Sequence, residues 1–320
     1  MKARIIRMTL ARKFDHFLES IEDATLKEEI KNNTIITGGC IVSLLQNEDV
    51  SDFDLYFRTS DVAFKVAKYY IERFLKNPPT TFKDNNGQVV RIGVKQESDR
   101  IRIVIKSAGV AGEIGQNDYQ YFETLPEVQA DEAQGQFLET AMKNADDADD
   151  ESAGKLDEDK NDKKAKKYRP IFITSNAITL SNKMQIVVRF FGEPDQIHDN
   201  YDFVHCTNYW TSWDRQLTLR PDALEAILTK DLRYVGSKYP ICSLIRSRKF
   251  IKRGWNINAG QYVKMAWQIG QLDLTNLHVL EEQLIGVDAA YFRQLIEVLQ
   301  KKDPEKVDGA YLMSVIDKVF

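Results

Sequence analysis

This sequence has few of the residues that build disulfide frameworks or metal fingers, and no long apolar run. Its three cysteines, Cys40, Cys206 and Cys242, are too few for a disulfide scaffold and too scattered for metal-ligand spacing. The four histidines are equally dispersed. No stretch reaches the ~20 apolar residues of a membrane helix, and residues 1–13 lack the apolar core of a secretory signal. We therefore expect a cytoplasmic protein of a reducing compartment, without a membrane partner.

The sequence also has no excess of basic residues over acidic ones. The net charge of −4 excludes a globally basic surface, so a nucleic-acid partner would need a local patch. Apolar residues, in contrast, are plentiful, at 43% of the chain. A chain of 320 residues with this composition can bury one large core or two modest ones.

The most informative stretch joins Gly38-Gly39, one short helix later, to Asp52-Phe53-Asp54. Two glycines allow a tight turn where the backbone can approach a phosphate at a helix N-terminus. On a strand, Asp52 and Asp54 share one face, ~7 Å apart. Mg²⁺ binds one or two carboxylates together with substrate phosphates, and metal sites of this kind serve displacement at phosphorus. The pattern predicts nucleotidyl transfer with Mg²⁺ or Mn²⁺ at the two aspartates.

Each half of this pattern has a simpler interpretation. A Gly-Gly pair is usually a turn, and an Asp-x-Asp pair often lies on a solvated strand edge. The combination is more specific, because an apolar helical run separates the two halves and the alternating residues Phe53, Leu55 and Phe57 follow.

In this order and spacing the motif resembles the catalytic head of the nucleotidyltransferase superfamily, and most closely its bacterial poly(A) polymerase and CCA-adding branch. Two later segments support the resemblance. Residues 200–208 are similar to that branch's Arg-Asp-Phe-Thr-Ile-Asn segment, with Asp202 and Phe203 matching. Residues 244–257 are similar to its arginine-rich helix.

The resemblance implies a role for the matching residues. Asp52 and Asp54 would be the catalytic metal ligands, and Gly38 and Gly39 would hold the triphosphate of an NTP. Ser43, which stands where that branch usually has an arginine-aspartate pair, would help to hold the triphosphate. The helix residues that it assigns to nucleotide binding are Arg246, Lys249 and Arg253. A solvated helix face is the alternative for these cations, which could also contact an RNA backbone, and a structural cap is the alternative for Asp202.

The chain departs from that branch in two ways. The family's third carboxylate lies on a strand antiparallel to the aspartate strand, and the best candidate strand here, residues 184–190, offers Gln185 instead. Glu113, Glu193 and Asp202 remain alternative sources. The base-selecting acidic and arginine residues are missing from residues 238–243, so selection of ATP or CTP by that mechanism is not implied.

Hydrophobic periodicity and turn residues predict an α+β fold, with strands and helices followed by an all-helical region, and the resemblance implies that the strands form a nucleotidyltransferase-like mixed sheet. The predicted domains are 1–220 and 221–320, with a charged, flexible insertion at about 126–167. The expected helices are 9–31, 39–47, 60–75, 193–200, 222–230, 240–253, 259–270, 275–284, 288–301 and 310–319. The expected strands are 34–37, 52–58, 89–94, 100–107, 170–180 and 184–191.

Two classes of function follow. The first is an enzyme that transfers a nucleoside monophosphate from an NTP such as ATP to a hydroxyl on RNA, a small molecule or a protein. The second is a catalytically inactive protein of the same fold that binds nucleic acid or serves in assembly, for example in a virion. We favour the enzyme. The divergent helix motif and the charged insertion fit a phage version of the family, which would act in the host cytoplasm.

Deleting residues 140–167 and joining the ends with a short Gly/Ser linker should leave the fold intact. Loop closure is insensitive to length, at about 0.6 kcal/mol for each doubling. Thermal melting checks this, and a large drop in melting temperature would show that the segment packs against the fold. If the segment binds nucleic acid, the deletion should also flatten the salt dependence of binding.

Overall fold

The computed structural model describes residues 2–76, 91–97, 100–106, 168–173 and 176–274, together with 276, 279 and 283. These residues form two compact units. The first contains the described residues up to His198 and Cys206–Arg220, and the second contains Asp199–His205 and the described residues from Pro221 onward. The charged insertion and the helices predicted at 288–301 and 310–319 lie outside the described residues, as does most of 275–284.

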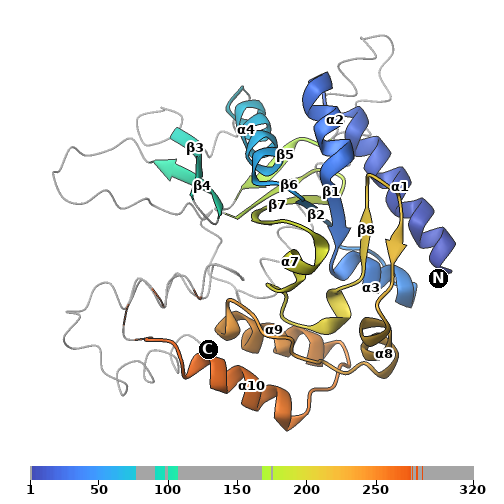
Figure 1. The fold of residues 1–320 in the computed structure, drawn as a ribbon, viewed down its shortest axis with the longest axis vertical. Helices are drawn as coiled ribbons and strands as arrows, with labels where there is room; N and C mark the ends of the chain where they lie inside the picture. Colours follow the sequence, from blue (N-terminus) through green and yellow to red (C-terminus); the bar gives the residue numbers. More distant parts are fainter. Residues whose placement is uncertain are drawn as a thin grey trace. The chain divides into compact units, whose positions relative to one another are not determined.

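The first unit is built on a seven-stranded mixed sheet in the order β5-β6-β7-β2-β1-β8-β9 (Figure 1). Its strands are β1 (Thr34–Thr37), β2 (Phe53–Phe57), β5 (Pro170–Ile173), β6 (Ala177–Leu180), β7 (Met184–Phe191), β8 (Tyr209–Thr211) and β9 (Leu217–Thr218). The central strand, β2, is antiparallel to β1 and parallel to β7. β3 (Arg91–Gln96) and β4 (Ile101–Lys106) form a separate antiparallel hairpin at the predicted place. With the helices below, this confirms the α+β class.

Helices cover one face of the sheet with apolar side chains. They are α1 (Ala3–Glu19), α2 (Ala24–Asn33), α3 (Gly39–Gln46) and α4 (Ser60–Lys76). Phe53, Leu55 and Phe57 alternate along β2 and are buried in the same core as these helices. The intervening Asp54 therefore lies on the other face, where α7 (Pro194–His198) packs against β7.

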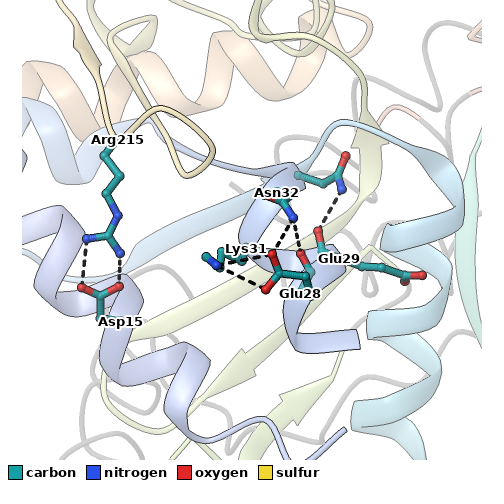
Figure 2. A network of polar contacts seen from close by, with 7 residues as sticks. Asp15, Glu28, Glu29, Lys31, Asn32 and Arg215 are labelled. Carbon is teal, nitrogen blue, oxygen red and sulfur yellow. Dashed lines mark hydrogen bonds and ion pairs between the residues drawn. The ribbon is translucent and has the colours of Figure 1, made fainter. Parts of the chain in front are cut away.

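Polar contacts explain why the N-terminal segment forms two helices, whereas one helix over 9–31 was predicted. The Asp23 carboxylate accepts hydrogen bonds from the backbone N–H groups of Thr25 and Leu26, at 2.9 and 3.0 Å, and so starts α2 anew. Figure 2 shows the neighbouring network, in which Arg215, in the turn between β8 and β9, donates to both carboxylate oxygens of Asp15 on α1. On α2, Glu28 accepts from Lys31 and Asn32.

Two strand predictions also need correction. Residues 170–180 were predicted as one strand and form two, β5 and β6, which pair antiparallel to each other. The β8–β9 hairpin was not predicted, because β9 has only two residues and gives no alternating pattern.

The second unit contains three described helices, α8 (Pro221–Thr229), α9 (Pro240–Lys252) and α10 (Ala259–Ile269). They match the predicted helices closely. Pro240 opens α9 at a position where no backbone donor is needed, and the Asn258 side chain accepts from the Gln261 N–H at the start of α10. A 3-10 turn, Val204–Cys206, connects the two units along the chain. Of the helices described in either unit, none is long and apolar enough to cross a membrane.

Replacing Phe14 with Ala should lower the free energy of unfolding by about 3–5 kcal/mol. The Phe14 ring is fully buried, 5.3 Å from the Trp210 ring and 6.2 Å from the Phe17 ring, so its loss leaves a cavity between α1 and β8. Met8→Ala on the same helix is the matched control, because Met8 is exposed. Urea unfolding measures both, and equal effects for the two variants would contradict this placement of α1.

Candidate functional site

The pairing of β1 with β2 brings the glycine turn and the aspartates to one end of the sheet. Thr37, the last residue of β1, pairs with Asp54, and the chain turns at Gly38 directly after it. Asp52 immediately precedes β2, rather than lying on it as predicted. Its spacing from Asp54 places both side chains on the same face of the sheet. Both aspartates are half-buried.

The turn has the backbone geometry that only glycine adopts readily. Gly38 has φ 94° and ψ −150° and its N–H donates to the Cys206 carbonyl at 3.2 Å. A Cβ at Gly39 would meet nothing within 4 Å, so the space beside the first turn of α3 is open. Ser43 follows Gly39 by one helical turn, on the same side, and is half-buried. The first N–H groups of α3 are therefore placed where an anion could accept hydrogen bonds from them.

The Cys40 thiol is within electrostatic reach of both carboxylates. Burial, followed by the negative charges of Asp54 and Asp52, raises the pKa of the Cys40 thiol well above its usual value. The thiol is buried and donates to the Thr37 carbonyl at 3.7 Å. Cys40 is thus a core residue, as expected, and lies within electrostatic reach of both aspartates.

Gln185 is the direct neighbour of Asp54 on β7, but the direction of that strand was predicted wrongly. β7 is parallel to β2, with Phe53 paired to Met184 and Asp54 to Gln185. The reason is the turn at Asn182 and Lys183, both with positive φ, which returns the chain from β6 at the end where β2 begins. The Gln185 amide donates to the Thr179 hydroxyl at 3.3 Å.

The alternative sources of a third carboxylate lie elsewhere. Glu193 accepts from the Arg58 guanidinium at 2.7 and 2.9 Å. Asp202 belongs to the second unit. Glu113 lies outside the described residues. Across the described part of the chain, no group of three or more His, Cys, Asp or Glu residues could hold a metal ion.

The donor set fits one hard divalent cation. Two carboxylates on one face, beside an open helix N-terminus that could bind phosphate, match the way Mg²⁺ is bound by one or two carboxylates plus substrate oxygens. Asp52 and Asp54 would hold it.

Sequence reasoning missed His198, which supports the site from α7. Its Nε2 lies 2.8 Å from the Thr37 hydroxyl, which also donates to the Asn208 carbonyl at 2.9 Å. Burial, and next the charge of Arg220, lower the pKa of His198 to about 3, so the ring is neutral at neutral pH. His198 is 161 residues from Thr37 in sequence, and no local pattern links the two.

The predicted nucleotide-binding cations lie on or after α9 in the second unit. Arg246 forms an ion pair with Asp202, whose other carboxylate oxygen accepts from the Ser243 hydroxyl at 2.7 Å. Asp202 is buried, so this contact favours the structural interpretation of that residue. Lys249 and Arg253 are exposed, and Arg253 is the C-cap of α9.

His205 is enclosed by aromatic rings in the second unit. Its ring centroid lies 4.3 Å from that of Trp255 and 4.8 Å from that of Phe250. Among the described residues, neither ring nitrogen has a hydrogen-bond partner. Burial lowers the pKa of His205 to about 4, although the nearby Asp202 carboxylate opposes the shift.

A mixed sheet whose central strand presents two aspartates beside a glycine turn is consistent with a nucleotidyltransferase-like α+β protein. The family assignment is more specific. The model of the Gabija anti-defense 2 family matches residues 8–230, and the chain belongs to this family. The match includes the aspartates, the glycine turn and Gln185, and it ends before α9.

This chain is similar in sequence to one phage protein and in structure to one solved enzyme. The Gabija anti-defense 2 protein of Bacillus phage SPbetaL7 is 22% identical over 139 residues, which span 43% of this chain and 33% of the phage protein. The matched part is thus about a third of that relative's length. The crystal structure of the Bacillus stearothermophilus CCA-adding enzyme in complex with CTP also matches. The matched region covers 89% of this chain and 51% of the enzyme chain, at 10% sequence identity and a TM-score of 0.33. That structural similarity is too low to support a conclusion.

The free energy of unfolding should fall as the pH drops from about 6.5 toward 4. The pKa values of His198 and His205 in the folded protein lie below the unfolded value of about 6.5, so the unfolded chain binds protons first. Each histidine contributes a slope of up to about 1.4 kcal/mol per pH unit. Their stabilising effect is complete above pH 6.5.

His205→Phe, which keeps an aromatic ring in the enclosure, should remove one proton from this dependence. Urea unfolding between pH 4.5 and 8 measures the slope. His16→Gln serves as the control, because His16 is exposed. An unchanged slope in His205→Phe would contradict the burial of His205.

Proposed function

We propose that this protein is a divalent-metal-dependent nucleotidyltransferase that moves a nucleoside monophosphate from an NTP to a hydroxyl acceptor. The pairing of Thr37 with Asp54 is the observation that supports this most. It puts the open space at Gly39 next to two carboxylates that share a face. Neither element alone would suggest phosphoryl chemistry, but together they offer a binding place for phosphates and for their cation.

Each residue has a defined part in this proposal. The backbone N–H groups that follow Gly38 and the hydroxyl of Ser43 bind the triphosphate. Asp52 and Asp54 hold Mg²⁺ or Mn²⁺, which when bound neutralises phosphate charge. In the second unit, Lys249 and Arg253 are exposed cations that could bind an RNA backbone, whereas Arg246 is already engaged by Asp202.

The reaction is a substitution at the α-phosphorus of the NTP. The acceptor oxygen forms the new P–O bond, the bond to the β-phosphate breaks, pyrophosphate leaves, and the hydroxyl proton passes to solvent. Glycine-turn donors hold the phosphates in place while this occurs, so the chain contributes mainly orientation and charge stabilisation.

The family gives this chemistry a biological setting. The curated relative is encoded by a phage and is named for its action against a defence called Gabija. We propose that this chain is also phage-encoded, acts in the host cytoplasm against the same defence, and uses RNA or a component of that defence as its acceptor. Incorporation of each of the four labelled NTPs, with total RNA and with the Gabija proteins as acceptors, tests this.

A catalytically inactive relative of the same fold is the second candidate, supported by the neutral Gln185 beside Asp54. Such a protein would bind nucleotide or nucleic acid, or serve in assembly, without transfer. Stable binding of an NTP with no incorporation into any acceptor would favour it over the enzyme.

Asp52→Asn and Asp54→Asn should each abolish transfer while leaving the protein folded. Each variant should be slightly more stable without metal, because removing one charge relieves the repulsion between the carboxylates. Mg²⁺ plus the bound NTP should stabilise the parent by about 2.7 kcal/mol at 100 times Kd, and neither variant should respond. Thermal melting measures this.

Asp49→Asn is the matched control, since it removes one carboxylate from the exposed segment just before Asp52. It should retain both the activity and the metal-plus-NTP response. If the parent itself shows no such response with any of the four NTPs, the nucleotidyltransferase proposal fails.

A further inference from the structure

The positions that flank the aspartates determine how many cations the site can hold. Side chains paired across neighbouring strands lie about 5 Å apart on the same face. A carboxylate that shares two metal ions with Asp54 would therefore come from position 37 on β1 or position 185 on β7. These positions are Thr37 and Gln185.

Both side chains are neutral, and each has a defined partner. The Thr37 hydroxyl lies 2.8 Å from Nε2 of His198 and 2.9 Å from the Asn208 carbonyl oxygen. The Gln185 amide nitrogen donates to the Thr179 hydroxyl. Neither residue brings the negative charge that a second divalent cation would require.

The residue that precedes β7 carries a positive charge. Lys183 comes directly before Met184, the partner of Phe53, and its carbonyl accepts from the Phe53 N–H at 2.8 Å. Its ammonium donates to the Val50 carbonyl at 3.1 Å, in the segment that leads into Asp52. β7 and the turn before it therefore offer one amide and one cation beside the aspartate pair, where paired metals about 4 Å apart would need bridging anionic ligands.

We propose that this site binds one divalent cation, not two, and that Gln185 sets that number. The inference rests on the proposed function, because the remaining ligands of the cation would be phosphate oxygens of the NTP. The acceptor hydroxyl is then not activated by a second cation. We therefore expect the nucleotide to bind well while its transfer to the acceptor is slow.

Counting bound Mn²⁺ by electron paramagnetic resonance, with α,β-methylene analogues of the four NTPs in turn, tests this. The wild-type chain should bind one Mn²⁺ per molecule in the presence of the analogue that binds. Gln185→Asp should bind two and show the broadened spectrum of coupled ions. Gln185→Asn, which matches Asp in shape but has no charge, should bind one.

The outcomes distinguish failure of the one-cation inference from failure of the proposed nucleotidyltransferase function. Two bound ions in the wild-type chain would overturn the one-cation inference and leave the proposed function standing. No bound ion with any analogue would overturn both. A single ion in a folded Gln185→Asp variant would show that Gln185 does not set the number, and Gln185→Glu, with its longer reach, provides a second test if the Asp variant does not fold.

Discussion

The candidate site depends on the register between β1 and β2. Phe53, Leu55 and Phe57 are buried against the helices, and each large apolar side chain contributes about 1.5–3 kcal/mol when buried. A slip of one residue would move these rings to the opposite face and bury Asp54 instead. The hydrophobic core therefore fixes where the aspartates lie, and with them the glycine turn that follows β1.

Electrostatics on the aspartate face is consistent with cation binding. Burial raises the pKa of the Cys40 thiol, and the two nearby carboxylates, Asp54 and Asp52, raise it further. Among the described basic groups, Lys183 donates to the Val50 carbonyl, and Lys13 donates to the Asn182 carbonyl beside the Phe53 ring. His198, which holds Thr37 in place, is uncharged at neutral pH. The site thus combines two carboxylates with an open helix N-terminus, a combination suited to a metal–nucleotide complex.

Local patterns predicted much of the fold. The alternation on β2, the proline that opens α9, the Asn258 cap of α10, and the β3–β4 hairpin all follow from neighbouring residues. The errors concern turns and caps whose local geometry the hydrophobic pattern does not reveal. The direction of β7 depends on a turn of two left-handed residues, and the break before α2 depends on the Asp23 cap. At the site, the sequence indicated the glycines and aspartates, whereas the roles of His198 and of Asp202 with Arg246 required the structure.

A crystal structure with Mn²⁺ and a non-hydrolysable NTP analogue would test the central claim most directly, because anomalous scattering locates the metal without ambiguity. The account predicts a single Mn²⁺ bound by Asp52 and Asp54, with the triphosphate against the N–H groups that follow Gly38. A triphosphate bound elsewhere, or a metal that contacts neither aspartate, would contradict it.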